Sequence, residues 1–269
     1  MKLGCDTVLF NQLDLYGALQ HVAWAGYDGV QLAILANWAR HIKLDTNQSY
    51  IDEVKETAKK HGLELQAINA DVGGLPGEDR IKSMITLFDV AHKLGIPIIT
   101  FRSGGLTGDL KTLKQEIQYV KKISSAAESR GITLAFNPHT GGAIYNVETL
   151  IPLLDAVDSP ALGLTFDPKE LYRAGVDLSE YILRMGKKIV HANFRDYPER
   201  ERPEATPEEQ IPGHGNIDFP QILRNLKDIG YDGDIDVVIV GAFWQPLSRQ
   251  MGIAAEARGY LHRCLQELK

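Results

Sequence analysis

Short apolar runs alternate with longer amphipathic stretches along the whole chain. Runs of this kind predict strands at residues 2–7, 29–33, 63–69, 97–102, 133–138, 162–167, 188–195 and 234–240. Between them, stretches such as 50–62, 79–95 and 110–131 repeat apolar residues at the helical spacing. Several of these helical stretches end where a left-handed C-cap is expected, at Gly62, Gly95, Gly131 and Gly230.

Eight strand-then-helix units in 269 residues predict a single-domain (β/α)8 TIM barrel over residues 1–269, because such barrels typically need ~250 residues. A doubly wound open sheet is the alternative. That fold usually has a glycine-rich first turn, and the first turn here, "DTVLFNQLD", has none. The charged, proline-rich segment 196–214 is predicted to be a surface loop insertion.

Composition narrows the class of protein. A net charge of -6 disfavours a nucleic-acid groove, which needs basic groups to neutralise phosphates. The two cysteines, Cys5 and Cys264, match no metal or redox spacing. The start "MKLGCDT" lacks the apolar core of a signal peptide, and no apolar run reaches the ~18 residues of a membrane span. We expect a cytoplasmic protein with no nucleic-acid or membrane partner, and homo-oligomer formation stays open.

Polar residues gather where the predicted strands end. Barrel active sites lie at the C-terminal ends of the strands, and alternate side chains of a strand face the same side. This alternation predicts an inward row that includes Arg102, Asn137, Asp167, His191, Asn193, Arg195 and Asp236. Polar groups in a barrel lumen need partners or a ligand. The sequence therefore predicts a ligand site at one half of the barrel mouth.

Five segments carry a resemblance to a known family. They are the opening "KLGCDTVLF…AGYDGVQL" (2–10 and 25–32), "LAFNPHTGG" (134–142), "LGLTFDPKELYRAGVD" (162–177), "KIVHANFRDY" (188–197) and the G-x-G-x-I-D-F pattern with its following helix (213–233). Together they resemble the xylose-isomerase-like TIM barrels, which include sugar-phosphate isomerases and epimerases and inosose-processing enzymes. The resemblance runs through the whole chain and implies a small sugar or sugar phosphate as the partner.

The resemblance also implies a divalent metal (Mn, Mg or Zn) held by four strand-end residues. Asp167 matches one ligand position, but Asn137, Asn193 and Val238 stand where a Glu, a His and a Glu are expected. Neutral amides are weak substitutes for carboxylates, and valine cannot ligate. We therefore predict no metal and no other cofactor. A relocated metal site built from Asp167, Glu170, His139 and His191 stays open.

The candidate roles follow from side-chain chemistry and from the resemblance. Asp167 or Glu170 is the candidate base, and His191 or His139 is its partner acid. Substrate contacts are expected from Asn137, Asn193, Arg195, Arg102, His214 and Trp38. Plainer roles compete with these: Asp167 could cap the next helix, His191 could be a core histidine, and Asp236 could form a buried pair with Arg102 or His191.

These features predict a carbohydrate isomerase- or epimerase-like enzyme. Its substrate would be a small ketose, inosose or other keto sugar, with phosphorylation left open, and protons would move next to a carbonyl. The alternative is a non-catalytic sugar-binding or regulatory barrel that kept the cavity and lost the chemistry.

Overall fold

The computed structural model describes residues 1–35, 39–71 and 77–268. The strands are β1 (Leu3–Asp6), β2 (Gly29–Leu35), β3 (Ala39–Arg40), β4 (Glu64–Asp71), β5 (Ile98–Phe101), β6 (Thr133–Phe136), β7 (Leu162–Phe166), β8 (Ile189–Phe194) and β9 (Ile235–Val237). The α-helices are α1 (Leu15–Trp24), α2 (Gln48–Lys60), α3 (Gly77–Leu94), α4 (Leu110–Glu128), α5 (Val147–Ala156), α6 (Pro168–Arg173), α7 (Leu178–Met185), α8 (Phe219–Asp228) and α9 (Leu247–Glu267). Short 3-10 helices are η1 (Thr7–Phe10), η2 (Gly186–Lys188) and η3 (Ala242–Trp244).

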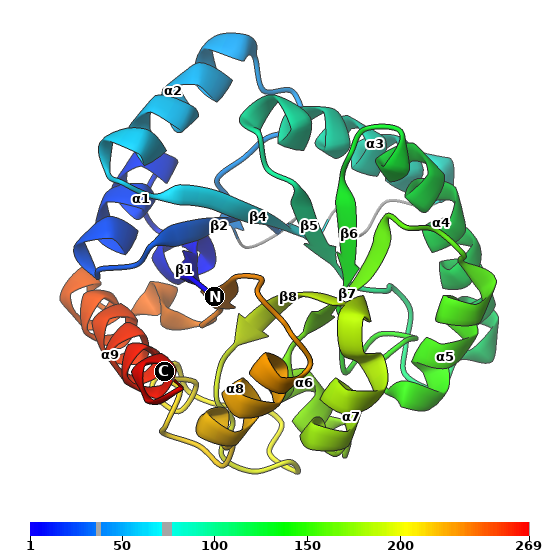
Figure 1. Cartoon of the computed structure of the whole chain (residues 1–269). Helices are drawn as coiled ribbons and strands as arrows, with labels where there is room; N and C mark the ends of the chain where they lie inside the picture. The colour runs from blue at the N-terminus through cyan, green and yellow to red at the C-terminus, as the bar shows by residue number, and fades with distance from the viewer. Residues whose placement is uncertain (36–38, 72–76, 269) are drawn as a thin grey trace.

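Within the described residues, eight parallel strands form a closed barrel with helices around it (Figure 1). The barrel closes because β1 pairs with both β2 and β9. The two-residue β3 adds to β2 in the antiparallel sense. The predicted (β/α)8 barrel is therefore confirmed.

The core between strands and helices is built from the apolar positions of the predicted runs. All five residues of β7 are buried, as expected for a parallel strand covered on both sides. An aromatic row links strands to helices: the ring centroids of Phe166 and Phe194 lie 6.3 Å apart, and those of Phe194 and Phe219 lie 5.2 Å apart. Burying one such side chain stabilises the fold by about 1.5–3 kcal/mol.

Local signals set the helix ends. Asp109 begins α4 by accepting hydrogen bonds from the backbone N–H groups of Lys111 and Thr112. The four glycines predicted as C-caps all have positive φ, for example 71° at Gly62 and 66° at Gly131. A left-handed backbone at these positions lets the chain leave the helix without the steric cost that a Cβ would bring.

The last strand is shorter than the sequence pattern predicts. The expected strand 234–240 ends at Val237. Beyond it, the Gln210 side chain forms hydrogen bonds with both backbone groups of Val240. Its Nε2 donates to the carbonyl oxygen and its Oε1 accepts from the N–H, both at 3.0 Å. A side chain of the 196–214 loop thus replaces a neighbouring strand as the hydrogen-bond partner, which apolar patterning does not reveal.

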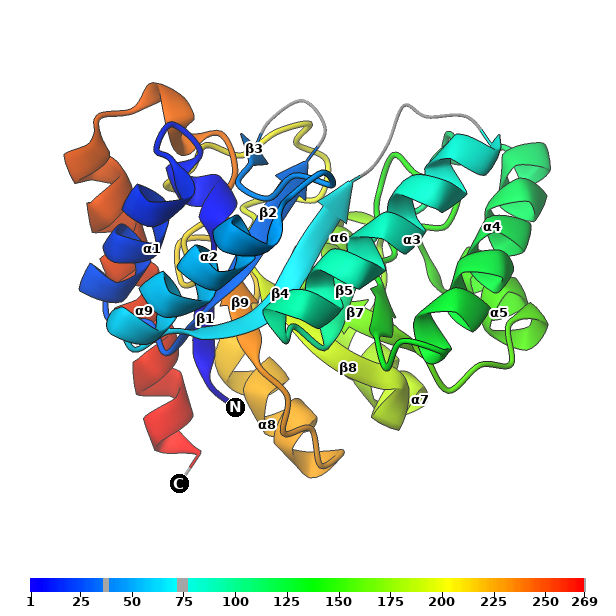
Figure 2. The same cartoon turned by 90° about the horizontal axis from the view of Figure 1, so that it is seen from above.

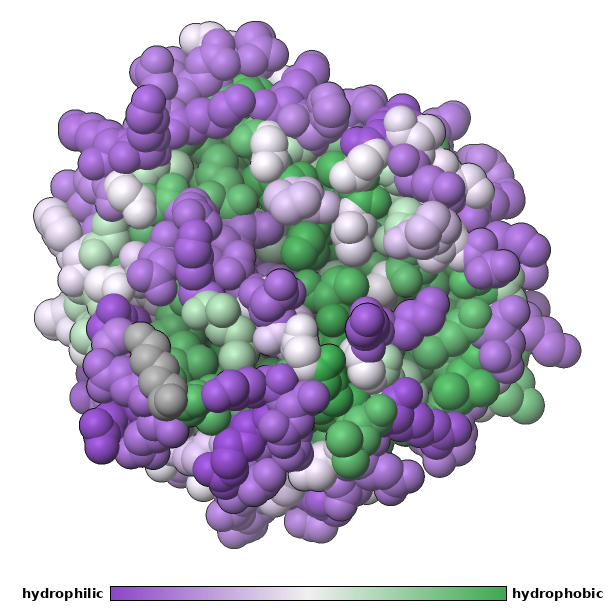
Figure 3. Space-filling model, in the orientation of Figure 1, coloured by the Kyte–Doolittle hydropathy of each residue, from purple (hydrophilic) through white to green (hydrophobic). Residues whose placement is uncertain are grey.

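All barrel strands direct their C-terminal ends to one end of the molecule, the upper edge in Figure 2. The loop between β8 and α8 and the segment after β9 lie along that edge. Figure 3 shows the opposite end, where the chain termini lie and where hydrophilic residues surround smaller hydrophobic areas. Among the described residues, none of the helices combines the length and apolar character needed to cross a membrane.

Gly4 is predicted to be sensitive to the smallest substitution. A Cβ at Gly4 would collide with Gln66 Oε1 and Asp236 Oδ1 in the buried lumen. We expect Gly4→Ala to lower the free energy of unfolding by about 2 kcal/mol, as overpacking does, measured by urea denaturation. Gly252→Ala is the control, because a Cβ at this exposed position of α9 meets nothing within 4 Å. Equal stability of the two variants would contradict the prediction.

Candidate active site

Three neighbouring strands bring polar side chains to one point at the barrel mouth. Asn137 follows β6, Asp167 follows β7, and Arg195 follows β8. Asp167 Oδ2 accepts hydrogen bonds from Asn137 Nδ2 at 3.3 Å and from Arg195 Nη2 at 3.4 Å. Its other oxygen accepts from the Glu170 N–H at 3.3 Å and so caps α6. Asp167 therefore has the capping role as well as a place in the site.

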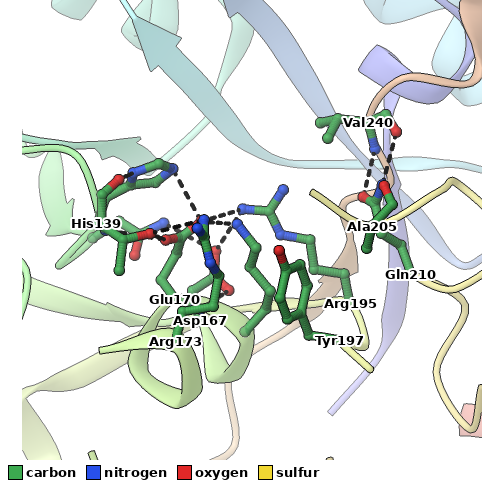
Figure 4. A network of polar contacts seen from close by, with 12 residues as sticks. His139, Asp167, Glu170, Arg173, Arg195, Tyr197, Ala205, Gln210 and Val240 are labelled. Carbon is green, nitrogen blue, oxygen red and sulfur yellow. Dashed lines mark hydrogen bonds and ion pairs between the residues drawn. The ribbon is translucent and has the colours of Figure 1, made fainter. Parts of the chain in front are cut away.

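Glu170 lies at the centre of a buried charge cluster, which we call the Glu170 cluster (Figure 4). Its Oε1 contacts Lys169 Nζ, Arg195 Nη2 at 2.9 Å and His139 Nε2 at 3.1 Å. Its Oε2 accepts hydrogen bonds from the backbone N–H of Thr140 at 3.0 Å and from the Thr140 hydroxyl. Both carboxylate oxygens are thus fully engaged.

The charges of the cluster set the protonation of Glu170. Burial alone would raise the pKa of the carboxyl group, but His139, Lys169 and Arg195 together outweigh it and hold the pKa well below its ordinary value. The Glu170 side chain is fully buried and lines neither cavity described below. In this geometry Glu170 acts as a charged counter-ion. Neither of its carboxylate oxygens is open to a proton of the substrate, so the geometry does not support its candidate role as a base.

Lys169 is a site residue that sequence reasoning missed. It follows Pro168 in the first turn of α6, is only 8% exposed, and lines the cavity beside Asp167. Burial, reinforced by the nearby Arg195 charge, lowers the pKa of Lys169 to about 8, against the opposing effect of Glu170. The available signal was its position two residues after the strand-end Asp167, but alternation along a strand does not extend into a helix.

His139 contacts the cluster from the loop after β6. Its Nδ1 lies 2.6 Å from the carbonyl oxygen of Thr140, and its Nε2 faces Glu170. Burial lowers the pKa of His139, while the Glu170 charge opposes that shift. Both ring nitrogens therefore have partners within the chain, and His139 can pass a proton to a ligand only after one of these contacts opens.

Deeper in the lumen lies a second set of buried polar groups. His191 Nε2 lies 3.2 Å from Asp236 Oδ2 and 3.1 Å from Gln31 Nε2. Burial raises the pKa of Asp236 above its ordinary value, although His191 opposes the shift. Of the two partners predicted for Asp236, the structure places His191 beside it. His191 is fully buried and lines neither cavity, so its candidate role as the partner acid does not match its position.

The remaining predicted substrate contacts differ in where they lie. Asn193 and Arg102 line the same cavity as Asp167, and Arg102 Nη2 forms an ion pair with Asp71 at 3.0 Å. His214 lies apart from both cavities: its Nε2 contacts Glu256 of α9 at 2.8 Å on the surface. The structure thus does not bring His214 to either of these cavities, because its side chain lies against α9. Trp38 lies outside the described residues.

Two adjacent cavities open at this end of the barrel. The inner cavity has a volume of about 290 Å³ and is lined by Asn69, Arg102, Asn137, His139, Asp167, Lys169, Asn193, Arg195 and Val238, among others. Its volume is close to the lower end of small-molecule pockets. Polar side chains with amide, imidazole, carboxylate and cationic groups converge on it, which suits a ligand with several hydroxyl groups.

The outer cavity has a volume of about 910 Å³ and shares Lys169, Arg195 and Val240 with the inner one. Its other walls come from α6, the loop after β8, the segment after β9 and the two residues that follow η1, Asn11 and Gln12. Asp196 fixes that loop: Oδ1 accepts from the N–H groups of Tyr197 and Ile217 at 2.8 and 3.1 Å, and Oδ2 accepts from the Gly213 N–H at 2.8 Å.

The donor set at the mouth does not suit a divalent cation. Of the four ligand positions that the family resemblance implies, Asp167 alone carries a carboxylate, and Arg195 already donates to its Oδ2. Among the described residues, no group of three or more His, Cys, Asp or Glu side chains is arranged to hold a metal ion. Of the side chains considered for a relocated site, Glu170 is enclosed by cationic groups and His191 lies deeper, beside Asp236.

Comparison with known proteins adds relatives of this fold. An inosose dehydratase of Clostridium perfringens is 24% identical over 274 residues, covering 90% of this chain and 87% of the relative. A fructoselysine 3-epimerase of Escherichia coli O157:H7 is 23% identical over 256 residues, covering 89% and 90%. The solved structure of a D-tagatose 3-epimerase-like protein superposes with a TM-score of 0.79 at 20% identity, covering 99% of this chain and 97% of the other.

The family model described as xylose isomerase-like TIM barrel matches residues 19–262, nearly the whole chain. It spans every strand from β2 to β9 and therefore the Glu170 cluster, the described lining residues of the inner cavity and most of those of the outer cavity. The chain belongs to the xylose isomerase-like TIM barrel family.

Proposed function

We propose that this chain is a sugar isomerase- or epimerase-like enzyme that moves a proton next to the carbonyl of a small keto sugar. The relatives include an inosose dehydratase and a fructoselysine 3-epimerase, whose names describe chemistry on such compounds. The observation that carries the proposal is a carboxylate, Asp167, that pairs with Arg195 and lines the inner cavity together with the cationic Lys169. A proton acceptor beside fixed cations is what enolate chemistry requires.

Asp167 is the base in this proposal. It lines the inner cavity, whereas Glu170 is enclosed by its partners. Asp167 takes the proton from the carbon next to the carbonyl, the C–H bond breaks, and the electron pair moves to the carbonyl oxygen. Return of a proton to the same carbon on its opposite face inverts that centre. Return to the former carbonyl carbon moves the carbonyl to the neighbouring carbon, whose hydroxyl proton passes to the former carbonyl oxygen. His139 is the candidate donor for that return.

The oxyanion is held by groups of the chain itself. Lys169 and Arg195 supply charged donors, and the side-chain amides of Asn137 and Asn193 supply neutral ones. A preorganised donor of this kind is worth roughly 3–4 kcal/mol of transition-state stabilisation. In this proposal these cationic groups stabilise the charge that a divalent metal would otherwise stabilise, so the reaction needs no metal.

A sugar-binding barrel without chemistry is the second candidate. It is favoured by the engagement of Asp167, whose oxygens accept from Asn137, Arg195 and the Glu170 N–H. Each of these donors occupies an oxygen that would otherwise be open to a proton of the substrate. The two candidates differ in one observable, the exchange of a carbon-bound hydrogen with solvent.

Hydrogen exchange tests the proposed reaction. Incubated in D₂O with a panel of ketoses and inososes, the wild-type protein should incorporate deuterium next to the carbonyl of at least one compound, as read by NMR. Asp167→Asn should reduce the exchange rate by about 10²-fold or more, the range of general-base catalysis. Thermal stabilisation by a sugar without any exchange would overturn the enzyme proposal and support the binding barrel.

The pH dependence of the reaction tests Lys169. Its ammonium form is the one that stabilises the oxyanion, and its pKa is lowered from 10.5 to about 8. The exchange rate is therefore expected to fall as pH rises through about 8, because Lys169 then loses its proton. In Lys169→Arg the charge persists, so the alkaline fall should disappear from this range. An unchanged fall near pH 8 in that variant would assign it to another group.

A stability measurement tests the role of Glu170 as a buried counter-ion. Glu170→Gln leaves Lys169 and Arg195 buried without their shared counter-ion, so we expect about 3 kcal/mol less stability by urea denaturation. Glu256→Gln is the matched control, because it removes only the exposed contact with His214 and should cost less than about 0.5 kcal/mol. A Glu170→Gln protein as stable as wild type would contradict the role of Glu170 as counter-ion.

A further inference from the structure

The outer cavity has cationic walls that the proposed reaction does not use. Arg173, at the end of α6, and Arg202, in the loop after β8, line it together with the shared Lys169 and Arg195. Among its described lining residues, Glu204 alone is acidic. A cavity with this excess of positive charge favours an anionic ligand.

The arginines differ in whether their charge is already neutralised. Arg202 forms a bidentate ion pair with Glu209, in which Nη1 donates to Oε1 and Nη2 donates to Oε2 at 3.2 Å. Arg173 donates from Nη1 to the Thr140 hydroxyl at 3.3 Å and lies over the Tyr197 ring at 5.3 Å, and it forms no ion pair with any described carboxylate. A cation at a cavity wall without an acidic partner is the group that an anion would neutralise.

Two buried N–H donors at this wall also have no partner. The Nε atoms of Arg173 and Arg195 are buried and have no hydrogen-bond partner among the described residues. Arg195 is only 6% exposed and lines both cavities, while its Nη2 points to Asp167 and Glu170. Its guanidinium therefore touches the carboxylates of the inner site and borders the outer cavity as well.

We propose that the outer cavity is an anion-binding subsite, centred on Arg173, for a phosphate or carboxylate group carried by the substrate at the end away from its carbonyl. The inner cavity takes the reacting part of such a ligand, and the shared wall of Lys169, Arg195 and Val240 joins the two spaces. The substrate class is then an acidic keto sugar. That the ligand is a keto sugar rests on the proposed function, whereas the anion subsite does not.

The segment after β9 gives the outer cavity an aromatic surface. Trp244 is 85% exposed although it is a large aromatic residue, and its ring centroid lies 4.6 Å from that of Phe243. Both side chains line the outer cavity. An exposed indole beside a cationic wall suits a ligand whose carbon chain packs on the ring while its charged end reaches the arginine.

Calorimetric titration with three ketoses that differ only at C6 tests the subsite. D-fructose is neutral, D-fructuronate carries a carboxylate, and D-fructose 6-phosphate carries a phosphate. We expect wild-type protein to bind at least one of the two anionic sugars roughly tenfold more tightly than D-fructose, as one charge-assisted contact provides. The tighter of the two identifies the anion. Inorganic phosphate alone is titrated as the probe that does not depend on the sugar.

Arginine variants locate the binding group. Arg173→Gln should remove the preference for the anionic sugar, and Arg173→Lys should restore part of it. Arg200→Gln is the matched control, since Arg200 is an exposed arginine stacked on Tyr172, 4.7 Å from its ring, and lines neither cavity. Thermal midpoints of all variants show whether each remains folded.

The outcomes separate the subsite from the proposed reaction. Equal affinity of wild type for all three sugars, or phosphate binding that Arg173→Gln leaves unchanged, overturns the subsite. Anion preference that depends on Arg173, in a protein that exchanges no hydrogen, keeps the subsite and overturns the reaction. Hydrogen exchange on neutral sugars without any preference for anionic ones keeps the reaction and overturns the subsite.

Discussion

The carboxylate of Glu170, buried among basic groups, is the interaction on which the rest of the site depends. A charge removed from water is costly unless it is paired and hydrogen-bonded, and here every oxygen has partners. Each partner is fixed in return. Lys169, Arg195 and His139 come from three different segments, and their contacts with one carboxylate hold them at the same cavity. Groups held in this way need little reorganisation when a ligand develops charge.

Local sequence explains how that carboxylate reaches its place. β7 ends at Phe166, Asp167 caps the following helix, and Pro168 occupies its first turn, where a missing N–H is harmless. The short helix α6 therefore begins at the barrel mouth. Its first turn directs Lys169 and Glu170 into the interior, and its last residue, Arg173, reaches the outer cavity. One six-residue helix supplies charge to both spaces.

The fold and part of the site could be predicted from the sequence. Alternation of apolar runs with amphipathic stretches predicts the barrel, since each strand is covered by its own helix. The period of two along a strand predicts that Asn137, Asp167 and Asn193 face one space, because strand geometry continues to the strand end. It does not predict Lys169 or Arg173, which lie on a helix with a different period, or the orientation of His214, which depends on how its loop packs against α9.

The hydrogen bonds of Asp196 have a consequence for how this barrel can diversify. A single carboxylate joins Tyr197 at one end of the loop to Gly213 and Ile217 at the other, so the two ends are closed independently of the residues between them. The entropy of loop closure rises slowly with length, by roughly 0.6 kcal/mol for each doubling. Apart from Gln210, which holds Val240, the intervening stretch forms a wall of the outer cavity and can vary in length and composition without opening the ends of the loop. Ligand preference can change there while the barrel beneath it stays intact.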